Sequence, residues 1–250
     1  MAGQRILKKE IPTIMSDTPP VMSDTPSVVL GHFTTYRLAR RFWDLEAAER
    51  TKRARAWFAG LEETAEQTRL YLVQGIESGG DVLVWSSIRV PDACDPGRYF
   101  VSRAGADNAH RDVLEPAHVL WGLTRPSEYS KARSAQEIDP FADERSPYLV
   151  MYPFTKTADW YLLGRDTRQG MMNEHIRIGK QFRDITQLLL YSFGLQDHEF
   201  LVVYETGDLS RFSRLVYDLR DTEARRYTKG DTPLHAGVLV SPEAWAETLG

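Results

Sequence analysis

The chain has 250 residues, 42% of them hydrophobic and 26% charged, with a formal net charge of −4. These values are typical of a globular protein with a sizeable core, and they give no electrostatic reason to expect nucleic acid or an anionic membrane as partner. The single cysteine, Cys94, excludes an internal disulfide framework, and no apolar run is long enough to cross a bilayer. We therefore expect a cytoplasmic protein.

The first predicted segment is a flexible tail at 1–27. It contains MSDTP twice, is rich in Pro, Ser, Thr and Asp, and shows no apolar periodicity. Segments of this composition bury too little apolar surface to fold by themselves, so the folded part is expected to start near residue 28.

The first half then alternates strands and helices. In chain order the pattern predicts a strand at 27–38, a helix at 42–61, strands at 68–77 and 81–90, a helix at 97–114 and a strand at 118–126. Ser78, Gly79 and Gly80 separate the two central strands and predict a hairpin turn.

The second half repeats that order. The pattern predicts extended segments at 148–156 and 160–163, a helix at 165–182, strands at 186–195 and 199–206, a helix at 208–227 and a strand at 234–240. Asp208 is the expected N-cap of the last long helix.

Both halves therefore have the order βαββαβ, which predicts an α+β protein made of a duplicated ferredoxin-like unit. We place the halves at 28–145 and 146–250, with the joint near 141–148. Two such sheets can join edge to edge into a barrel, which removes their exposed edges.

The helix at 165–182 has a histidine on its apolar face. With spacings of 4, 3 and 4 residues, this face consists of Met171, His175, Ile178 and Phe182. An imidazole turned toward a core needs a partner there.

The helix at 208–227 shows a similar exception, because a carboxylate continues its apolar stripe. The stripe consists of Phe212, Val216, Leu219 and Glu223. An inward His175 and an inward Glu223 match a metal-binding imidazole whose other ring nitrogen is held by a carboxylate. A plain buried His–Glu hydrogen bond is the alternative.

No further metal ligands are spaced around His175. The remaining histidines, which form no cluster with it, are His32, His110, His118, His198 and His235. A single histidine ligand suffices for haem, where the macrocycle supplies four donors, so the pattern permits haem without establishing it.

Four segments resemble the C-terminal half of the chlorite dismutase-like haem proteins, a family that includes coproheme decarboxylases. They are YLVMYPFTKTADWYLL, EHIRIGKQF, LLLYSFGLQDHEFLVVYET and LRDTEARRYTKGDTPLHAG, between residues 146 and 238. The resemblance implies a dimeric α+β barrel, a homopentamer and haem in the C-terminal half. It also implies that His175 is the proximal iron ligand.

Within the resemblance, Gln187 occupies the distal position. Chlorite dismutases have an arginine seven residues before the glycine of the central hairpin, here Gln187 before Gly194. One group of coproheme decarboxylases has glutamine there, and a neutral amide supplies no permanent cation. An ordinary strand glutamine is the alternative.

Three further residues follow from the resemblance. Tyr152, in the motif MYPFTK, corresponds to the tyrosine whose radical takes hydrogen from a propionate, while Lys156 is implied to pair with a propionate and Trp160 to pack near the porphyrin. Core packing and solvation are the alternatives for these side chains.

The chain also departs from the family patterns. No arginine matches the propionate-binding one securely, and Arg133 and Arg145 are candidates by neighbourhood only. The segment 127–138 lacks the distal histidine of a second decarboxylase group.

The favoured hypothesis is hydrogen peroxide-dependent oxidative decarboxylation of iron coproporphyrin III (coproheme) to haem b in haem biosynthesis. Two other hypotheses stay open. The first is another haem enzyme of the family, with chlorite decomposition or peroxidase activity, and the second is a non-catalytic haem-binding protein.

Overall fold

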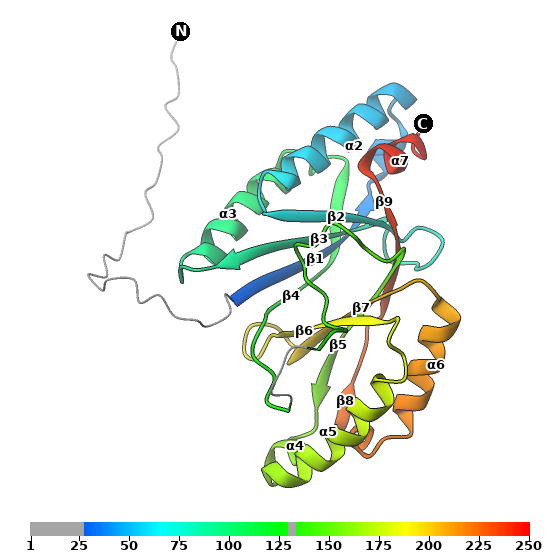
Figure 1. Cartoon of the computed structure of the whole chain (residues 1–250). Helices are drawn as coiled ribbons and strands as arrows, with labels where there is room; N and C mark the ends of the chain where they lie inside the picture. Colours follow the sequence, from blue (N-terminus) through cyan, green and yellow to red (C-terminus); the bar gives the residue numbers. More distant parts are fainter. Residues whose placement is uncertain (1–27, 130–133) are drawn as a thin grey trace, which may run out of the picture.

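The computed structural model describes residues 28–129 and 134–250, and its elements are labelled in Figure 1. The first half contains β1 (Val28–Leu38), α1 (Arg40–Trp43), α2 (Ala47–Glu62), β2 (Gln67–Leu72), β3 (Val82–Val90), α3 (Asp95–Asn108) and β4 (Leu114–Leu123). The predicted tail at 1–27 lies outside the described residues.

The second half starts with β5 and ends with a short helix. Its elements are β5 (Tyr148–Lys156), α4 (Ala158–Leu162), α5 (Arg165–Gly179), β6 (Thr186–Tyr191), β7 (Phe200–Thr206), α6 (Leu209–Arg220), the 3-10 helix η1 (Glu223–Tyr227), β8 (Thr228–Gly230), β9 (His235–Val240) and α7 (Pro242–Glu247). The boundary proposed between residues 145 and 146 stays a prediction.

The strands confirm the predicted fold class. The first four are ordered β4-β1-β3-β2, and their counterparts in the second half are ordered β6-β7-β5-β9, the same arrangement in each unit. Antiparallel pairing of β4 with β6 and of β2 with β9 joins the units at both edges. These pairings close a barrel and leave neither sheet with a long free edge.

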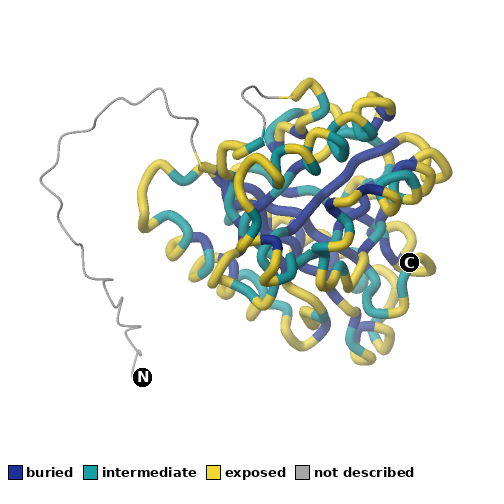
Figure 2. The backbone as a smooth tube through the Cα atoms, turned by 90° about the horizontal axis from the view of Figure 1, so that it is seen from below, coloured by how far each residue is buried: buried dark blue, intermediate teal, exposed yellow. Residues whose placement is uncertain are grey.

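The barrel interior is an apolar core. Alternate residues of the strands point inward and form one cluster: Phe33, Tyr71, Val73, Leu83, Trp85, Leu120, Leu149, Met151, Leu188, Leu190, Leu201 and Val203, together with Ile138 from the connecting loop. Figure 2 shows these strands as the buried part of the chain, with exposed segments around them.

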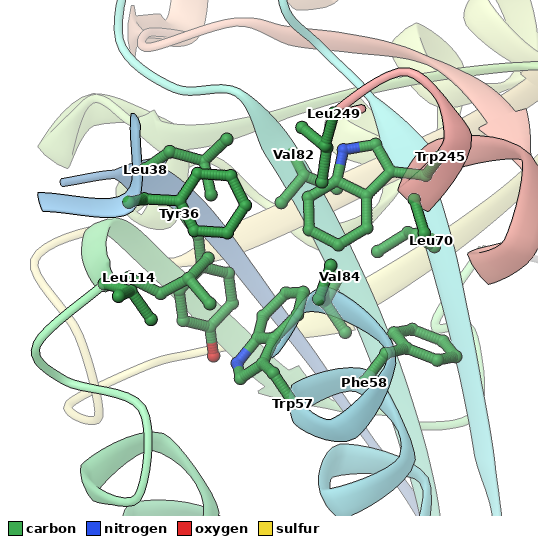
Figure 3. Close-up of a cluster of buried hydrophobic side chains, with 14 of the residues drawn as sticks. Tyr36, Leu38, Trp57, Phe58, Leu70, Val82, Val84, Leu114, Trp245 and Leu249 are labelled. Carbon is green, nitrogen blue, oxygen red and sulfur yellow. The ribbon is translucent and has the colours of Figure 1, made fainter. Parts of the chain in front are cut away.

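The outer face of the first unit is covered by helices. From α2, Trp57, Phe58 and Leu61 pack on the strands, and Trp245 of α7 joins them. Figure 3 shows the indole rings of Trp57 and Trp245 meeting beside Tyr36, and the two ring centroids lie 5.6 Å apart. The outer face of the first unit is therefore filled by side chains of α2 and α7.

Several predicted elements are wrong in type or extent. The predicted strand at 68–77 ends at Leu72, and the predicted helix at 97–114 ends at Asn108, so that Leu114 already belongs to β4. The segment 160–163 is not extended, because Thr157 starts the short helix α4 by accepting a hydrogen bond from the amide of Trp160. A short apolar run does not distinguish a strand from a helix turn. The predicted helix at 42–61 is two helices, α1 and α2, and α6 ends at Arg220 instead of reaching Tyr227.

No helix in the described ranges is long and apolar enough to span a membrane.

Candidate functional site

The second unit has an aromatic outer face on β5, β7 and β6. Because inward residues alternate with outward ones, three cross-strand rows point away from the barrel: Val150–Tyr204–Gln187, Tyr152–Val202–Leu189 and Phe154–Phe200–Tyr191. We call this surface the β5–β7–β6 face. It is apolar except for two phenol groups near its centre, a third at one end and one amide at a corner.

Helix α6 covers part of this face. Its side chains Phe212 and Leu215 are buried against Val150, Val202 and Tyr204. Asp208 caps the helix as predicted, because its carboxylate accepts from the second and third amides that follow it.

Helix α5 lies farther from the strands. None of its residues is buried, its main neighbours are α6 and η1, and Ile178 reaches the cluster on β5 and β7. Figure 1 shows α5 and α6 on the outer side of the second unit. The apolar stripe of α5 is only partly covered, because Ile178 and, after the helix, Phe182 pack on the cluster formed with α6, β5 and β7. The remaining part of the stripe is a candidate surface for a ligand.

His175 lies in the middle of α5 and is half-buried. Within the described residues its ring makes no hydrogen bond, ion pair or ring contact. Burial lowers the pKa of His175 to about 4, helped by the charge of Lys156 and opposed by that of Glu174. The imidazole is therefore neutral at ordinary pH and has a free nitrogen lone pair, as an iron ligand requires.

Lys156 ends β5 beside this histidine. Its Nζ donates to the carbonyl of Ala224 over 3.2 Å and lies 4.5 Å from the ring centre of Trp160. Burial and the nearby Arg225 lower the pKa of Lys156 to about 8. A carboxylate bound next to Lys156 would stabilise the charged form of this poorly solvated amine.

Tyr152 points from β5 into the β5–β7–β6 face. Its ring centroid is 6.1 Å from that of Tyr204, and the two hydroxyls share a hydrogen bond. Burial raises the pKa of Tyr152 above its usual value, and Tyr204 and the charge of Arg220 partly offset this effect. The phenol therefore keeps its proton at neutral pH.

Two arginines flank Tyr152 from outside the sheet. Arg220 at the end of α6 and Arg225 on η1 both pair with Asp231, over 2.9 Å and 2.7 Å. One carboxylate neutralises only one of the two guanidinium groups, so this side of Tyr152 is cationic. Lys156 adds a further positive charge.

Gln187 occupies the corner of the face and is exposed, directly across from Tyr204. Its backbone is held by the connecting loop, because the Gln187 amide donates to the carbonyl of Gln136 and its carbonyl accepts from Ile138. The Gln136 side-chain amide in turn donates to the carbonyls of Phe182 and Ile185, over 2.8 Å and 3.0 Å. Gln136 thus ties the end of the His175 helix to the Gln187 strand.

The predicted inward position of Glu223 is wrong. Helix α6 stops at Arg220, and the Thr222 hydroxyl bonds back to Leu219, so the apolar stripe does not extend to residue 223. The Glu223 side chain is 52% exposed and pairs with Arg226, and no hydrogen bond joins it to His175 in the described part of the chain. Its carboxylate is therefore not in the position expected of a histidine partner.

Trp160 is buried in α4, in contact with Tyr227 and with Lys156 above its ring. Arg145 is occupied elsewhere, since its guanidinium pairs with Glu205 and stacks on Trp85. Arg133 lies outside the described residues.

The predicted site residues Tyr152, Gln187, His175, Lys156 and Trp160 all lie in the second unit. Glu223 lies next to α5, where its amide donates to Glu174, but its side chain turns outward to Arg226. Sequence reasoning missed Tyr204, the arginine pair and Gln136. Of these residues, only Tyr204 could have been predicted from the sequence. The alternation of side chains in the β6–β7 hairpin places it on the same face of the sheet as Gln187.

In the described residues, no three histidine, cysteine or acidic side chains are grouped closely enough to hold a metal ion. The residues instead offer the chemistry that a planar iron macrocycle needs: a neutral imidazole on α5, aromatic side chains on β5, β6 and β7, and cations near Tyr152 for acidic substituents.

Comparison with known proteins shows which proteins this chain resembles. The family model for chlorite dismutase matches residues 44–240. A coproheme decarboxylase from Mycolicibacterium smegmatis is 29% identical over 174 residues, which are 70% of this chain and 73% of the relative. A chlorite dismutase from Ideonella dechloratans is 26% identical over 228 residues, 87% of this chain and 78% of that protein.

A solved structure of chlorite dismutase from Candidatus Nitrospira defluvii, in complex with imidazole, has the same fold. It superposes with a TM-score of 0.76 at 22% identity, over 90% of this chain and 96% of that one.

Proposed function

The chain belongs to the chlorite dismutase family, and from this premise we propose that it is a coproheme decarboxylase acting in haem synthesis. The substrate is iron coproporphyrin III, two of whose propionates become vinyl groups with hydrogen peroxide as oxidant. The same membership supports a homo-oligomer, with a pentamer as the expected state.

The observation that carries the proposal is the environment of Tyr152. The phenol is protonated, half-buried on an aromatic face and flanked by Lys156, Arg220 and Arg225. A phenol forms a neutral radical by losing an electron and a proton together, and nearby cations recruit a carboxylate to it. Simple haem binding needs neither feature.

His175 supports iron binding in this proposal. Its ring has no competing partner and stays neutral above about pH 4, so no proton has to be displaced when iron binds. When bound, the iron porphyrin supplies the oxidising power of peroxide to nearby side chains.

The chain's own contribution is to position and transfer hydrogen. The Tyr152 radical takes one hydrogen atom from the β-carbon of the propionate, carbon dioxide leaves, and a second electron passes to the oxidant. For each propionate, one peroxide and one proton are consumed, and one vinyl group, one carbon dioxide and two waters are formed. Lys156 and the arginine pair hold the carboxylate until it is lost.

Gln187 favours this chemistry over chlorite decomposition. Its amide donates and accepts hydrogen bonds but carries no charge, so it stabilises bound peroxide or water without confining an anion. We assign it the distal role, with the loop through Gln136 fixing its backbone.

The test is to incubate purified protein with iron coproporphyrin III and peroxide and to follow the porphyrin mass. We expect loss of carbon dioxide and two hydrogens from each of two propionates. His175→Ala should lose most of its haem affinity while staying folded, because α5 buries no residue.

A chlorite assay provides the opposing measurement. We expect little oxygen and rapid bleaching from the wild type, with Gln187→Arg evolving somewhat more. Sustained oxygen release by the wild type, with an unchanged porphyrin mass, would replace this proposal with chlorite chemistry.

A further inference from the structure

One end of the barrel has a polar cluster away from the β5–β7–β6 face. His235 of β9 pairs in register with Met151, and His118 of β4 pairs with Thr35, so both imidazoles project on the interior side. Their ring centroids lie 5.2 Å apart. Tyr152, next to Met151, points to the opposite side of the sheet.

The turn between β2 and β3 closes over these rings. From it, Glu77 Oε2 lies 2.9 Å from His235 Nδ1, and the two side chains are 14% and 3% exposed. Gly79 lies against His118, where an added Cβ would stand 3.3 Å from Nε2. With the Glu77 carboxylate beside Nδ1, the other ring nitrogen of His235, Nε2, has no partner among the described residues.

Three buried polar atoms of this cluster have no partner: His235 Nε2, Glu77 Oε1 and Thr35 Oγ1. Buried groups without hydrogen bonds are rare and destabilising, and three at one barrel end point to a ligand. The free atoms of histidine and glutamate are electron-pair donors, which favours a cation over an anion.

The ring spacing fits a shared metal ion. With a metal–nitrogen bond of about 2.1 Å, each imidazole ring centre lies about 3.2 Å from the metal. Two such ligands at the tetrahedral angle of about 109° have ring centres about 5.2 Å apart. A carboxylate on the far nitrogen of one ring is the usual support for such a ligand.

We propose that this barrel end binds one first-row transition-metal ion, of the zinc class, through His118 and His235, with Glu77 as positioning residue. As no three ligating side chains converge in the described ranges, water completes the coordination. That water would bond to Thr35 Oγ1 and Glu77 Oε1. The site is independent of the proposed porphyrin chemistry.

The test is calorimetric titration of the full chain with zinc chloride, without porphyrin, in a His175→Ala background that removes the half-buried imidazole of α5. We expect one zinc ion per chain. His118→Ala should weaken binding at least about tenfold, and Glu77→Gln by about 10- to 100-fold.

His198→Ala is the matched control, because this histidine lies in the turn between β6 and β7 and should leave affinity unchanged. His118 is exposed, so its variant should fold, which circular dichroism checks. No zinc binding by the parent, or equal affinity in His118→Ala and the parent, would overturn the proposal.

Discussion

The two ferredoxin-like units share one strand order but use their outer faces differently. In the first unit, α2 buries Ala54, Trp57, Phe58 and Leu61 against the sheet. In the second unit, the corresponding helix α5 buries no residue and has a neutral imidazole at its middle. The same layer is a closed core in one unit and a candidate binding surface in the other.

Buried charge shows the same contrast. In the first unit Arg103 is fully enclosed, and it donates to the hydroxyls of Tyr36 and Tyr99 and to Ser86. In the second unit Lys156 is only partly satisfied, and its pKa falls to about 8. A satisfied buried cation stabilises a fold, whereas an under-satisfied one is a candidate for ligand recognition.

The two units thus have the same strand order, but only in the first does the long helix after the first strand bury side chains against the sheet. Substitutions of buried residues in α2 should therefore lower the free energy of unfolding, whereas substitution of His175 in α5 should lower porphyrin affinity and leave stability nearly unchanged. The predictions run from the largest expected effect to the smallest.

The largest effect is expected from truncating the closed core. Trp57→Ala should lower the free energy of unfolding by about 3–5 kcal/mol, because it removes a fully buried indole and leaves a cavity. His175→Ala at the middle of α5 should cost less than about 1 kcal/mol. Urea denaturation without porphyrin measures both.

Trp43→Ala is the control, since this α1 indole is 44% exposed and its loss should change stability little. If His175→Ala destabilised the chain as much as Trp57→Ala, α5 would be a structural helix and the contrast between the units would disappear.

The second effect is on the proposed reaction. Tyr152→Phe should slow the first decarboxylation about a hundredfold or more, which corresponds to roughly 2.7 kcal/mol of barrier. Haem affinity should barely change, because only the hydroxyl is removed. Trp160, beside Lys156, offers an indole that can leave a slow residual rate.

Porphyrin mass against time measures this rate, with Tyr217→Phe as control on the exposed side of α6. Wild-type vinyl formation in Tyr152→Phe would make Tyr152 a packing residue.

The elements and the fold were predictable because they rest on local patterns. Two-residue alternation gives the strands, and repetition of βαββαβ gives the duplicated barrel. Gly79 and Gly80 correctly indicate that β2 and β3 are antiparallel neighbours, but the connection spans residues 73–81 and is longer than the predicted turn. The proposed roles of His175 and Gln187 rest on helix spacing and family resemblance.

What could not be predicted depends on contacts between distant segments or on where a helix stops. Gln136 bonds to carbonyls 43 to 49 residues farther along the chain, which no local pattern records. Glu223 was misplaced because its stripe continues in sequence past Arg220, while the Thr222 hydroxyl caps the last turn in the structure.

The third effect concerns the contact between the loop and α5. Gln136→Ala should lower the free energy of unfolding by about 1–3 kcal/mol, because it leaves the carbonyls of Phe182 and Ile185 without their donor. Hydrogen exchange should increase at the C-terminal end of α5. Unchanged exchange there would show that Gln136 does not hold the helix.

The fourth effect is a pH dependence of porphyrin affinity. Lys156 loses its proton as pH rises through about 8, so affinity for the propionate-bearing porphyrin should fall across that range. Lys156→Met should bind roughly fivefold more weakly at pH 7, about 1 kcal/mol, and lose this pH dependence. Lys180→Met, exposed at the end of α5, is the control.

The lowered pKa of Lys156 also determines how the stability of the folded chain changes with pH. The folded pKa of Lys156 lies below the unfolded value of 10.5, so between about pH 8 and 10.5 the unfolded chain binds more protons. The contribution of Lys156 to stability without ligand therefore rises with pH in that window. A rise in porphyrin affinity above pH 8 would contradict its role as a carboxylate partner.

The smallest effect is expected from Glu223→Gln. The exposed carboxylate pairs with Arg226 and does not touch His175, so the iron reduction potential and the iron–histidine stretching frequency should stay as in the wild type. Glu174→Gln is the informative comparison, because the charge of Glu174 acts on His175 and its carboxylate accepts the backbone amide of Glu223. Removing that charge should make the imidazole less basic and raise the potential modestly. A larger shift from Glu223→Gln than from Glu174→Gln would mean that porphyrin binding turns Glu223 inward.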